Sequence, residues 1–167
     1  MVDFRKYRTE DRDWVISANL RHYRNVEGFD RSFKDVIISA LDHLEQQVMD
    51  GRSHFIIADD KGCRVGCIFF SPEDEVSGRV RLFFLTEAYR GHGVGKRMLN
   101  QVIEHACQKE FETIRVSTFE QHRDACGLYA ATGFKGKVGE PMEAFGRVTR
   151  QVDFEYDLSP QSITLGQ

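Results

Sequence analysis

A glycine-rich turn lies between an apolar run and a periodic segment, and it reads Arg90-Gly91-His92-Gly93-Val94-Gly95-Lys96. The apolar run before it covers residues 80–85 and is typical of a buried strand. After the turn, apolar residues recur at three- and four-residue intervals, which predicts an amphipathic helix from residue 94 onward. A strand that passes through such a turn into a helix offers unpaired backbone N–H groups and a favourable helix dipole to a phosphate. The turn therefore predicts a site for a phosphate-bearing ligand.

The rest of the chain predicts a mixed succession of strands and helices. We expect strands at residues 2–7, 54–58, 65–70, 113–118, 134–138 and 148–158, and helices at residues 10–24, 33–48 and 123–131. The strands at 80–85 and 113–118 are joined by a helix, so we expect them to be parallel. The prolines Pro72, Pro141 and Pro160 are expected in loops. The pattern predicts an α/β architecture in which hairpins flank one parallel crossover.

Size, charge and cysteine usage narrow the class of protein. With 167 residues, 41% of them hydrophobic and 29% charged, the chain predicts one domain over residues 1–167. The net charge of -3 does not favour a nucleic-acid partner, and no apolar run approaches the roughly 20 residues that cross a membrane. The four cysteines are scattered through expected regular structure: Cys63, Cys67, Cys107 and Cys126. We therefore expect reduced thiols, no metal site and a cytoplasmic protein.

Two common phosphate-binding motifs do not fit the turn. A nucleoside-triphosphate loop needs G-x-x-x-x-G-K-[ST], but the glycine spacing here is one residue short and Arg97 replaces the hydroxyl residue. A dinucleotide fingerprint G-x-G-x-x-G needs glycine where Lys96 stands, and it belongs at the start of its fold. The pattern R-x-x-G-x-G is complete, with Arg90, Gly93 and Gly95 in place.

This pattern resembles the acetyl-CoA pyrophosphate loop of the GNAT superfamily of N-acetyltransferases. Residues 85–99 are similar to the family's strand-loop-helix block. A second block resembles the family's A-x-x-L-Y-x-x-x-G-F motif and reads Ala125-Cys126-Gly127-Leu128-Tyr129-Ala130-Ala131-Thr132-Gly133-Phe134. Because the order and spacing of both blocks agree with the family, the resemblance covers essentially the whole chain. It implies the GNAT fold, a mixed and mostly antiparallel sheet with a central splayed parallel strand pair and flanking helices.

The resemblance implies an acyltransferase that moves an acetyl group from acetyl-CoA to a primary amine of a small molecule or peptide. The pantetheine arm would lie between the splayed strands and pair with the backbone of Phe83, Phe84 and Leu85. The pyrophosphate would be held by the residues of the turn: Arg90, Gly91, His92, Gly93, Val94, Gly95 and Lys96. Tyr129 matches the family's tyrosine near the sulfur and would protonate the leaving thiolate. Relatives are often dimers, so a homodimer is also implied.

Departures from the family pattern leave parts of the site open. His122 stands where the family often has an Asn that holds the pantetheine arm, and Glu87 stands in the place of a common Pro. Residues 79–85 contain no carboxylate, so the general base could be Glu120 or His122, the proton could leave through water to solvent, or the amine could arrive neutral. A non-catalytic acyl-CoA-binding or interaction module on the same scaffold is the alternative function.

The acceptor is not identified by the sequence. In relatives, the segment between the first two helices lines the acceptor site, and here it contains His22, Tyr23, Arg24, Asn25, Glu27 and Asp30. Amino acids, polyamines, aminoglycoside-like amines and peptide N-termini are all compatible with a mildly acidic protein. Loops of this kind vary most among relatives.

Overall fold

The computed structural model describes residues 1–23, 32–144 and 146–159, and these build one seven-stranded sheet. The strands are β1 (Val2–Lys6), β2 (His54–Asp60), β3 (Cys63–Pro72), β4 (Ser77–Leu85), β5 (Thr113–Phe119), β6 (Lys135–Ala144) and β7 (Arg147–Asp157). Their order across the sheet is β1-β2-β3-β4-β5-β7-β6. The β4–β5 pair is parallel and the other neighbouring pairs are antiparallel. The predicted mixed sheet with a central parallel pair is confirmed.

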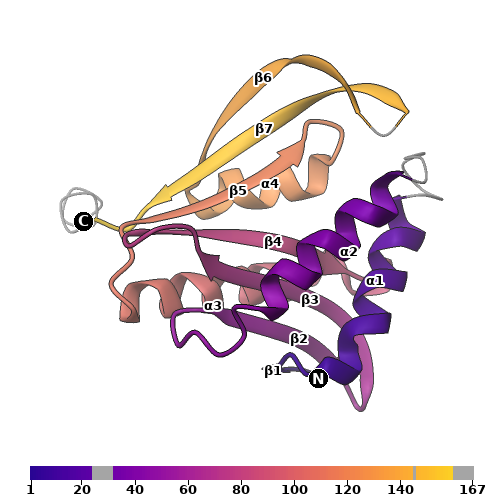
Figure 1. Cartoon of the computed structure of the whole chain (residues 1–167), viewed down its shortest axis with the longest axis vertical. Helices are drawn as coiled ribbons and strands as arrows, with labels where there is room; N and C mark the ends of the chain where they lie inside the picture. Colours follow the sequence, from indigo (N-terminus) through magenta and orange to yellow (C-terminus); the bar gives the residue numbers. More distant parts are fainter. Residues whose placement is uncertain (24–31, 145, 160–167) are drawn as a thin grey trace.

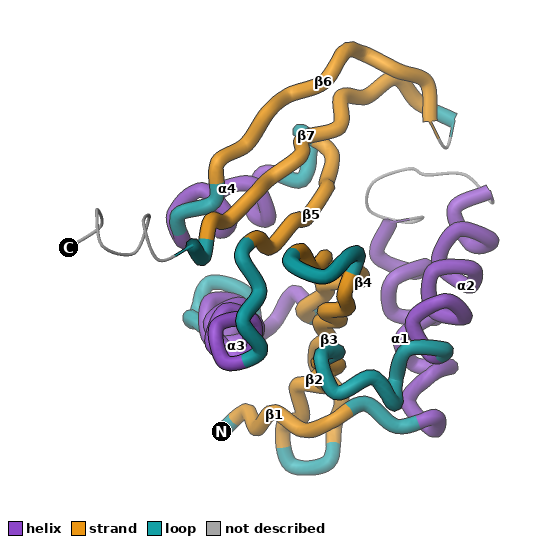
Figure 2. The backbone as a smooth tube through the Cα atoms, turned by 60° about the vertical axis from the view of Figure 1, so that its left-hand side comes forward, coloured by secondary structure: helices purple, strands orange, loops and turns teal. Residues whose placement is uncertain are grey.

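In the described part of the chain, four α-helices cover the two faces of the sheet (Figures 1 and 2): α1 (Arg12–Arg21), α2 (Ser32–Glu45), α3 (Val94–Gln108) and α4 (Arg123–Thr132). Helices α1 and α2 lie together on one face, and α3 lies on the other. Short 3-10 helices, η1 (Thr9–Asp11) and η3 (Glu87–Tyr89), precede α1 and the glycine-rich turn. Helix α3 forms the crossover between β4 and β5, as the sequence predicts.

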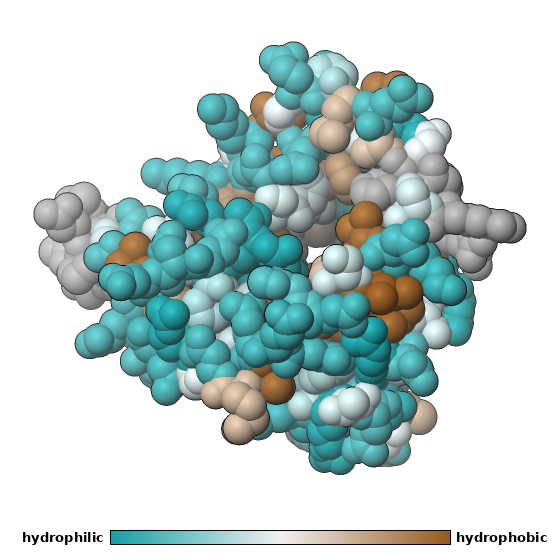
Figure 3. All heavy atoms as spheres, viewed as in Figure 1, coloured by the Kyte–Doolittle hydropathy of each residue, from teal (hydrophilic) through white to brown (hydrophobic). Residues whose placement is uncertain are grey.

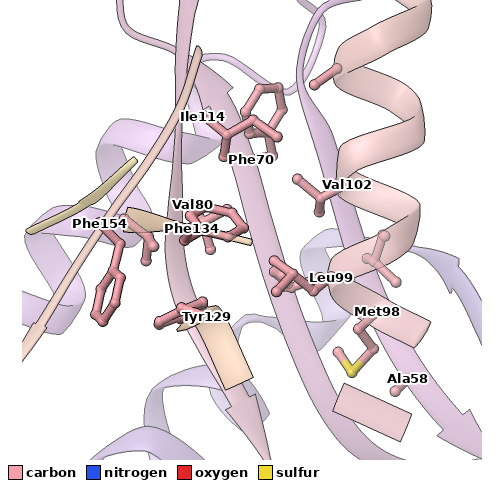
Figure 4. Close-up of a cluster of buried hydrophobic side chains, with 14 of the residues drawn as sticks. Ala58, Phe70, Val80, Met98, Leu99, Val102, Ile114, Tyr129, Phe134 and Phe154 are labelled. Carbon is pink, nitrogen blue, oxygen red and sulfur yellow. The ribbon is translucent and has the colours of Figure 1, made fainter. Parts of the chain in front are cut away.

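Two hydrophobic clusters lie on opposite faces of the sheet. The first joins the sheet to α3 and α4, and Figure 4 shows Leu99, Tyr129, Phe134 and Phe154 among its members. The second joins the sheet to α1 and α2 through residues that include Val15, Leu41, Leu44, Phe55 and Phe69. Strand β4 contributes Val80, Phe83 and Leu85 to the first cluster and Leu82 and Phe84 to the second. The middle of β4 is therefore held from both sides.

The sequence-based boundary of β6 is wrong. We predicted a strand at residues 134–138 and a loop around Pro141, but β6 runs from Lys135 to Ala144 and includes that proline. Strand β6 is at the edge of the sheet, and its register with β7 shifts between Val138 and Pro141. Proline is tolerated at edges and bulges, because its missing N–H removes no ladder hydrogen bond there. The loop prediction for Pro72 is also wrong, because Pro72 is the last residue of β3. Pro160 lies outside the described residues.

A buried carboxylate connects the N-terminal segment to the sheet. Asp11 accepts hydrogen bonds from both terminal nitrogens of Arg5, at 2.8 and 2.9 Å, and from Arg64 Nε at 2.7 Å. The Arg8 amide donates to the same carboxylate at 2.8 Å. Burial would raise the pKa of Asp11, but these donors outweigh it and hold the pKa well below its usual range. Asp11 therefore links β1, η1 and β3 as a charged group.

Two histidines stack where α3 crosses the sheet. The rings of His54 and His105 lie 4.5 Å apart and nearly parallel, and His105 Nε2 is 2.8 Å from the Arg52 carbonyl oxygen. Burial, together with the charge of His105 and Lys6, lowers the pKa of His54 to about 4. Burial also lowers the pKa of His105. Both rings are therefore neutral at pH 7.

The outer surface is mainly polar in the view of Figure 3. Exceptions include Val138, Met142 and Val148, which are exposed apolar residues of the β6–β7 hairpin. Among the described helices, none combines the length and hydrophobicity that a membrane span requires.

Candidate active site

Strands β4 and β5 diverge soon after they begin (Figure 1). Their pairing joins Ser77, Gly78 and Arg79 to Thr113, Ile114 and Arg115. No further pair is recorded between these two strands, although β4 continues to Leu85 and β5 to Phe119. Beyond Arg79, the edge of β4 that faces β5 therefore offers backbone N–H and C=O groups to a ligand.

A β-bulge turns the backbone of β4 within this opening. The register with β3 shifts between Cys67 and Phe69, and Leu82 adopts a φ of 50°. Positive φ is uncommon outside glycine, and bulges often redirect backbone groups beside active sites. The Cys67 thiol donates to the Leu82 carbonyl oxygen at 3.1 Å, and burial raises the pKa of this thiol to about 12. Cys67 thus remains a protonated donor that stabilises the bulge, a role that no sequence motif signals.

Two hydrogen bonds from residues just before the glycine-rich turn fasten it to the sheet. The Thr86 amide donates to the Val65 carbonyl oxygen at 2.8 Å, and the Tyr89 hydroxyl donates to the Asp60 carboxylate at 2.6 Å. Gly93 immediately precedes α3 and has a φ of 81°, a conformation that residues with a side chain rarely adopt. A Cβ atom at Gly93 would meet nothing within 4 Å. Glycine is required there for its backbone conformation and not for lack of space.

The turn presents a row of unused hydrogen-bond donors. No hydrogen bond from the backbone N–H groups of residues 91 to 96 is recorded to any described residue. Gly91, His92, Gly93 and Lys96 are exposed, whereas Val94 is buried and Gly95 is partly buried. Behind them lie the 15 residues of α3, whose dipole places positive potential at this end. The arrangement suits a phosphate or diphosphate group.

Two other residues of the motif have structural contacts. Arg90 Nε donates to the Leu85 carbonyl oxygen at 2.8 Å, and the guanidinium carbon lies 5.9 Å from the centre of the Phe84 ring. This side chain braces the turn against the end of β4, and its contact with a pyrophosphate stays a prediction. A Cβ atom at Gly95 would lie 3.4 Å from Leu128, so glycine at this position allows α3 to approach α4 closely.

Tyr129 projects from α4 into the core beneath the opening (Figure 4). Its ring packs against Phe83, Phe134 and Phe154 at centroid distances of 6.2, 5.6 and 5.3 Å. Burial raises the pKa of its hydroxyl above the usual value. Within the described residues this hydroxyl has no hydrogen-bond partner. Tyr129 is thus a protonated side chain that is able to donate and unsuited to act as a base.

The end of α1 meets the loop after β5 across the opening. The Tyr23 ring lies 5.0 Å from the His122 ring, and His22 lies 5.7 Å from the Phe84 ring on β4. His122 Nδ1 is 2.9 Å from Thr118 Oγ1, which fixes the ring at the start of α4. Glu120 is exposed, and its amide donates to the Arg150 carbonyl oxygen. The predicted acceptor residues Arg24, Asn25, Glu27 and Asp30 lie outside the described residues.

Comparison with known proteins agrees with this geometry. A model of the acetyltransferase (GNAT) family matches residues 17–134. The chain belongs to the GNAT family. The yncA protein of Salmonella typhimurium, solved with its cofactor acetyl-CoA, shares the fold with a TM-score of 0.75 and 14% identity over 95% of both chains. A GNAT-family acetyltransferase of Staphylococcus aureus Mu50 superposes with a TM-score of 0.77 and 17% identity, covering 95% of this chain and 100% of that one.

One curated relative is more similar in sequence over a shorter stretch. The spermine/spermidine N(1)-acetyltransferase of Bacillus subtilis is 41% identical over 66 residues, which are 38% of this chain and 43% of that protein. The chain therefore matches less than half the length of this relative.

The GNAT fold brings most of the predicted site together. Phe83, Phe84 and Leu85 line the unpaired part of β4, and the glycine-rich turn follows directly. His122 immediately precedes α4 and Tyr129 lies within that helix, on the other side of the opening. Sequence reasoning missed Arg81, which lines the same groove as Arg79, beside the opening.

Proposed function

We propose that this chain is a GNAT-type N-acetyltransferase, formed as one domain, that moves an acetyl group from acetyl-CoA to a primary amine. The observation that carries the proposal is the row of unused N–H donors at residues 91 to 96, at the mouth of the splayed strand pair. Family membership and the amine-acetylating relative of Bacillus subtilis support the same reaction. We also propose a small molecule or peptide as the acceptor, a cytoplasmic location and a homodimer.

The residues present fit a diphosphate and an extended pantetheine arm. The N–H groups of the turn, with Lys96 beside them, would hold the pyrophosphate, because charge-assisted hydrogen bonds are the stronger kind. The free edge of β4 from Val80 to Leu85 would pair with the amide groups of the arm. His122, fixed by Thr118, is the proposed substitute for the asparagine that other family members carry. When bound, acetyl-CoA supplies an activated thioester.

The chain's own residues then have two tasks. The first is to orient a neutral amine toward the thioester carbon, so that the N–C bond forms as the C–S bond breaks. Proximity of this kind supplies much of an enzyme's acceleration. The second is to donate a proton to the departing thiolate, and Tyr129 is suited to it because burial keeps its hydroxyl protonated.

Removal of the amine proton has no single assigned residue. An alkyl amine with a pKa near ~10.4 must lose a proton before attack, which costs roughly 4–5 kcal/mol at neutral pH. Strand β4 carries no carboxylate between Arg79 and Leu85. Glu120 and His122 are the candidate bases, and transfer through ordered water to solvent is the alternative route.

Two measurements test the proposal. Calorimetric titration with acetyl-CoA measures cofactor binding, and thiol release across a panel of amines measures transfer. Binding with release of thiol supports the transferase. Binding without release on any amine would instead support an acyl-CoA-binding module, and absence of binding would refute both functions.

A further inference from the structure

A groove of about 630 Å³ lies beside the point where β4 and β5 separate. The groove is on the α1/α2 side of the sheet. Its lining residue Arg81 pairs with Phe69 of β3, and the side chains of paired residues point to the same face of a sheet. Phe69 belongs to the hydrophobic cluster that includes Val15 and Leu41. The charged lining residues are Glu73, Arg79, Arg81, Arg115, Asp153 and Glu155. Equal numbers of acidic and basic side chains therefore face the groove.

The three carboxylates of the groove already have partners. Glu73 accepts a hydrogen bond from Arg79 Nε at 2.6 Å and pairs with Arg115 at 3.5 Å. Glu155 pairs with Arg115 at 3.1 Å. Asp153 accepts hydrogen bonds from the Ser117 hydroxyl at 2.6 Å and from the Gln151 amide at 2.9 Å. None of these carboxylates is left to attract a cationic ligand strongly.

Arg81 differs from the other two arginines of the groove. No ion pair of Arg81 is recorded with any described residue, and its Nε is buried without a hydrogen-bond partner. A guanidinium remains protonated in proteins, so its charge persists although burial and the neighbouring Arg79 lower its pKa more than the charge of Glu73 raises it. A buried donor without an acceptor is unfavourable, and a carboxylate is one of the groups that match the planar guanidinium with two parallel hydrogen bonds.

Arg81 is also close to the proposed reaction. It stands two residues beyond the last β4 residue that pairs with β5, and three residues before Phe84. Three residues of strand span about 10 Å. A group bound to Arg81 on the α1/α2 face would thus lie about 10 Å along β4 from the backbone of Phe84, where we expect the thioester to bind.

We propose that Arg81 binds a carboxylate of the acceptor, so that the amine acetylated by this protein belongs to a molecule that also carries a carboxylate, such as an amino acid or a peptide. This inference rests on the proposed function and narrows its substrate class. It also separates this chain from its polyamine-acetylating relative, because a polyamine would place further positive charge beside an unpaired guanidinium.

Matched amines that differ only in the carboxylate provide the test. Thiol release is measured with L-lysine against 1,5-diaminopentane, with L-phenylalanine against 2-phenylethylamine, and with spermidine. We expect kcat/KM to be at least ~10-fold higher for the carboxylate-bearing member of each pair, the size expected for one charge-assisted hydrogen bond. In Arg81→Gln and Arg81→Met, this preference should disappear through a higher KM, while acetyl-CoA affinity stays unchanged. Arg8→Gln removes the same charge from an exposed pair and should keep the preference.

A second readout does not depend on turnover. The Nε–H signal of Arg81 in a nitrogen-proton NMR spectrum, assigned by its loss in Arg81→Lys, should shift on titration with L-lysine and stay in place with 1,5-diaminopentane, with coenzyme A present. A preference for spermidine or for the decarboxylated amines would overturn the inference. An Arg81 Nε–H signal that does not shift on addition of L-lysine would also overturn the inference. If no amine is acetylated at all, the proposed function fails, and the NMR titration still decides whether Arg81 binds carboxylates.

Discussion

Replacement of Gly93 by glutamate tests the assignment of the glycine-rich turn. The substitution places a side chain on a residue with a φ of 81°, at the N-terminus of α3. A Cβ atom there meets nothing within 4 Å, so the fold has room for the new side chain. The backbone strain is about 1–2 kcal/mol, a value that a folded domain tolerates. The new carboxylate would lie among the N–H groups that we expect to hold the pyrophosphate.

The expected loss of affinity follows from Coulomb's law. Two negative charges about 5 Å apart repel each other by roughly 3 kcal/mol at an effective dielectric constant of about 20. Every 1.4 kcal/mol is about a tenfold change in a binding constant. The repulsion by itself therefore weakens acetyl-CoA binding by about 100-fold or more, before any steric effect is added.

Calorimetric titration of acetyl-CoA measures this loss, and two variants separate charge from strain. Gly93→Gln has the size and the strain of the glutamate without its charge, so it should bind more tightly than Gly93→Glu. Gly62→Glu introduces the same charge at a φ of 87° in the β2–β3 turn, also with no atom within 4 Å of the new Cβ. It should lose similar stability and keep full affinity. Equal affinity of Gly93→Glu and the unmodified protein would refute the assignment of the turn.

Three further predictions concern the proton donor, the buried carboxylate and the stacked histidines. Tyr129→Phe should lower kcat by about 100-fold in stopped-flow thiol release, which is the usual scale for one proton-transfer group. The acetyl-CoA affinity and the thermal midpoint should stay unchanged, because the ring packing is retained. An unchanged kcat would exclude Tyr129 as the donor. Asp11→Asn should lower the free energy of unfolding in urea by about 3–5 kcal/mol, because its two arginine partners lose their counter-charge, whereas Glu10→Gln in an exposed pair should change it by less than about 1 kcal/mol. The pKa of His54 is lowered in the folded state to about 4, so the unfolded chain takes up the proton first as the pH falls below about 6.5. The free energy of unfolding should therefore decrease by up to about 3 kcal/mol between pH 6.5 and 4. His54→Phe should flatten that part of the pH profile, and a profile identical to that of the unmodified protein would show that His54 does not cause it.

The local elements of the fold were predictable because their causes lie in neighbouring residues. The spacing of apolar residues predicts α3, and the glycine-rich turn predicts its start, which the structure has at Val94. Gly133 ends α4 with a φ of 114°, as expected of a glycine after a helix. The extent of β6 was not predictable, since Pro141 argues against a strand unless the strand is known to be an edge.

The candidate site was predictable in part. The motif around Arg90 and the block around Tyr129 depend on short-range pattern, and the GNAT resemblance gives them roles. The bulge at Leu82, the Cys67 donor that stabilises it and the unpaired Arg81 have no such pattern. Each depends on which strand lies beside β4 and on where its pairing stops.

By itself, the sequence determined the glycine-rich turn, the helix behind it and the order of strands and helices, because backbone conformation and amphipathic period are local properties. The tertiary structure decided how far β4 and β5 remain paired and which arginines of the groove find a carboxylate. Those outcomes come from contacts between residues distant in sequence, such as Arg79 with Ser117 and Arg115 with Glu155. Which charges of the groove are paired depends on these long-range contacts, so it cannot be read from the composition of the chain.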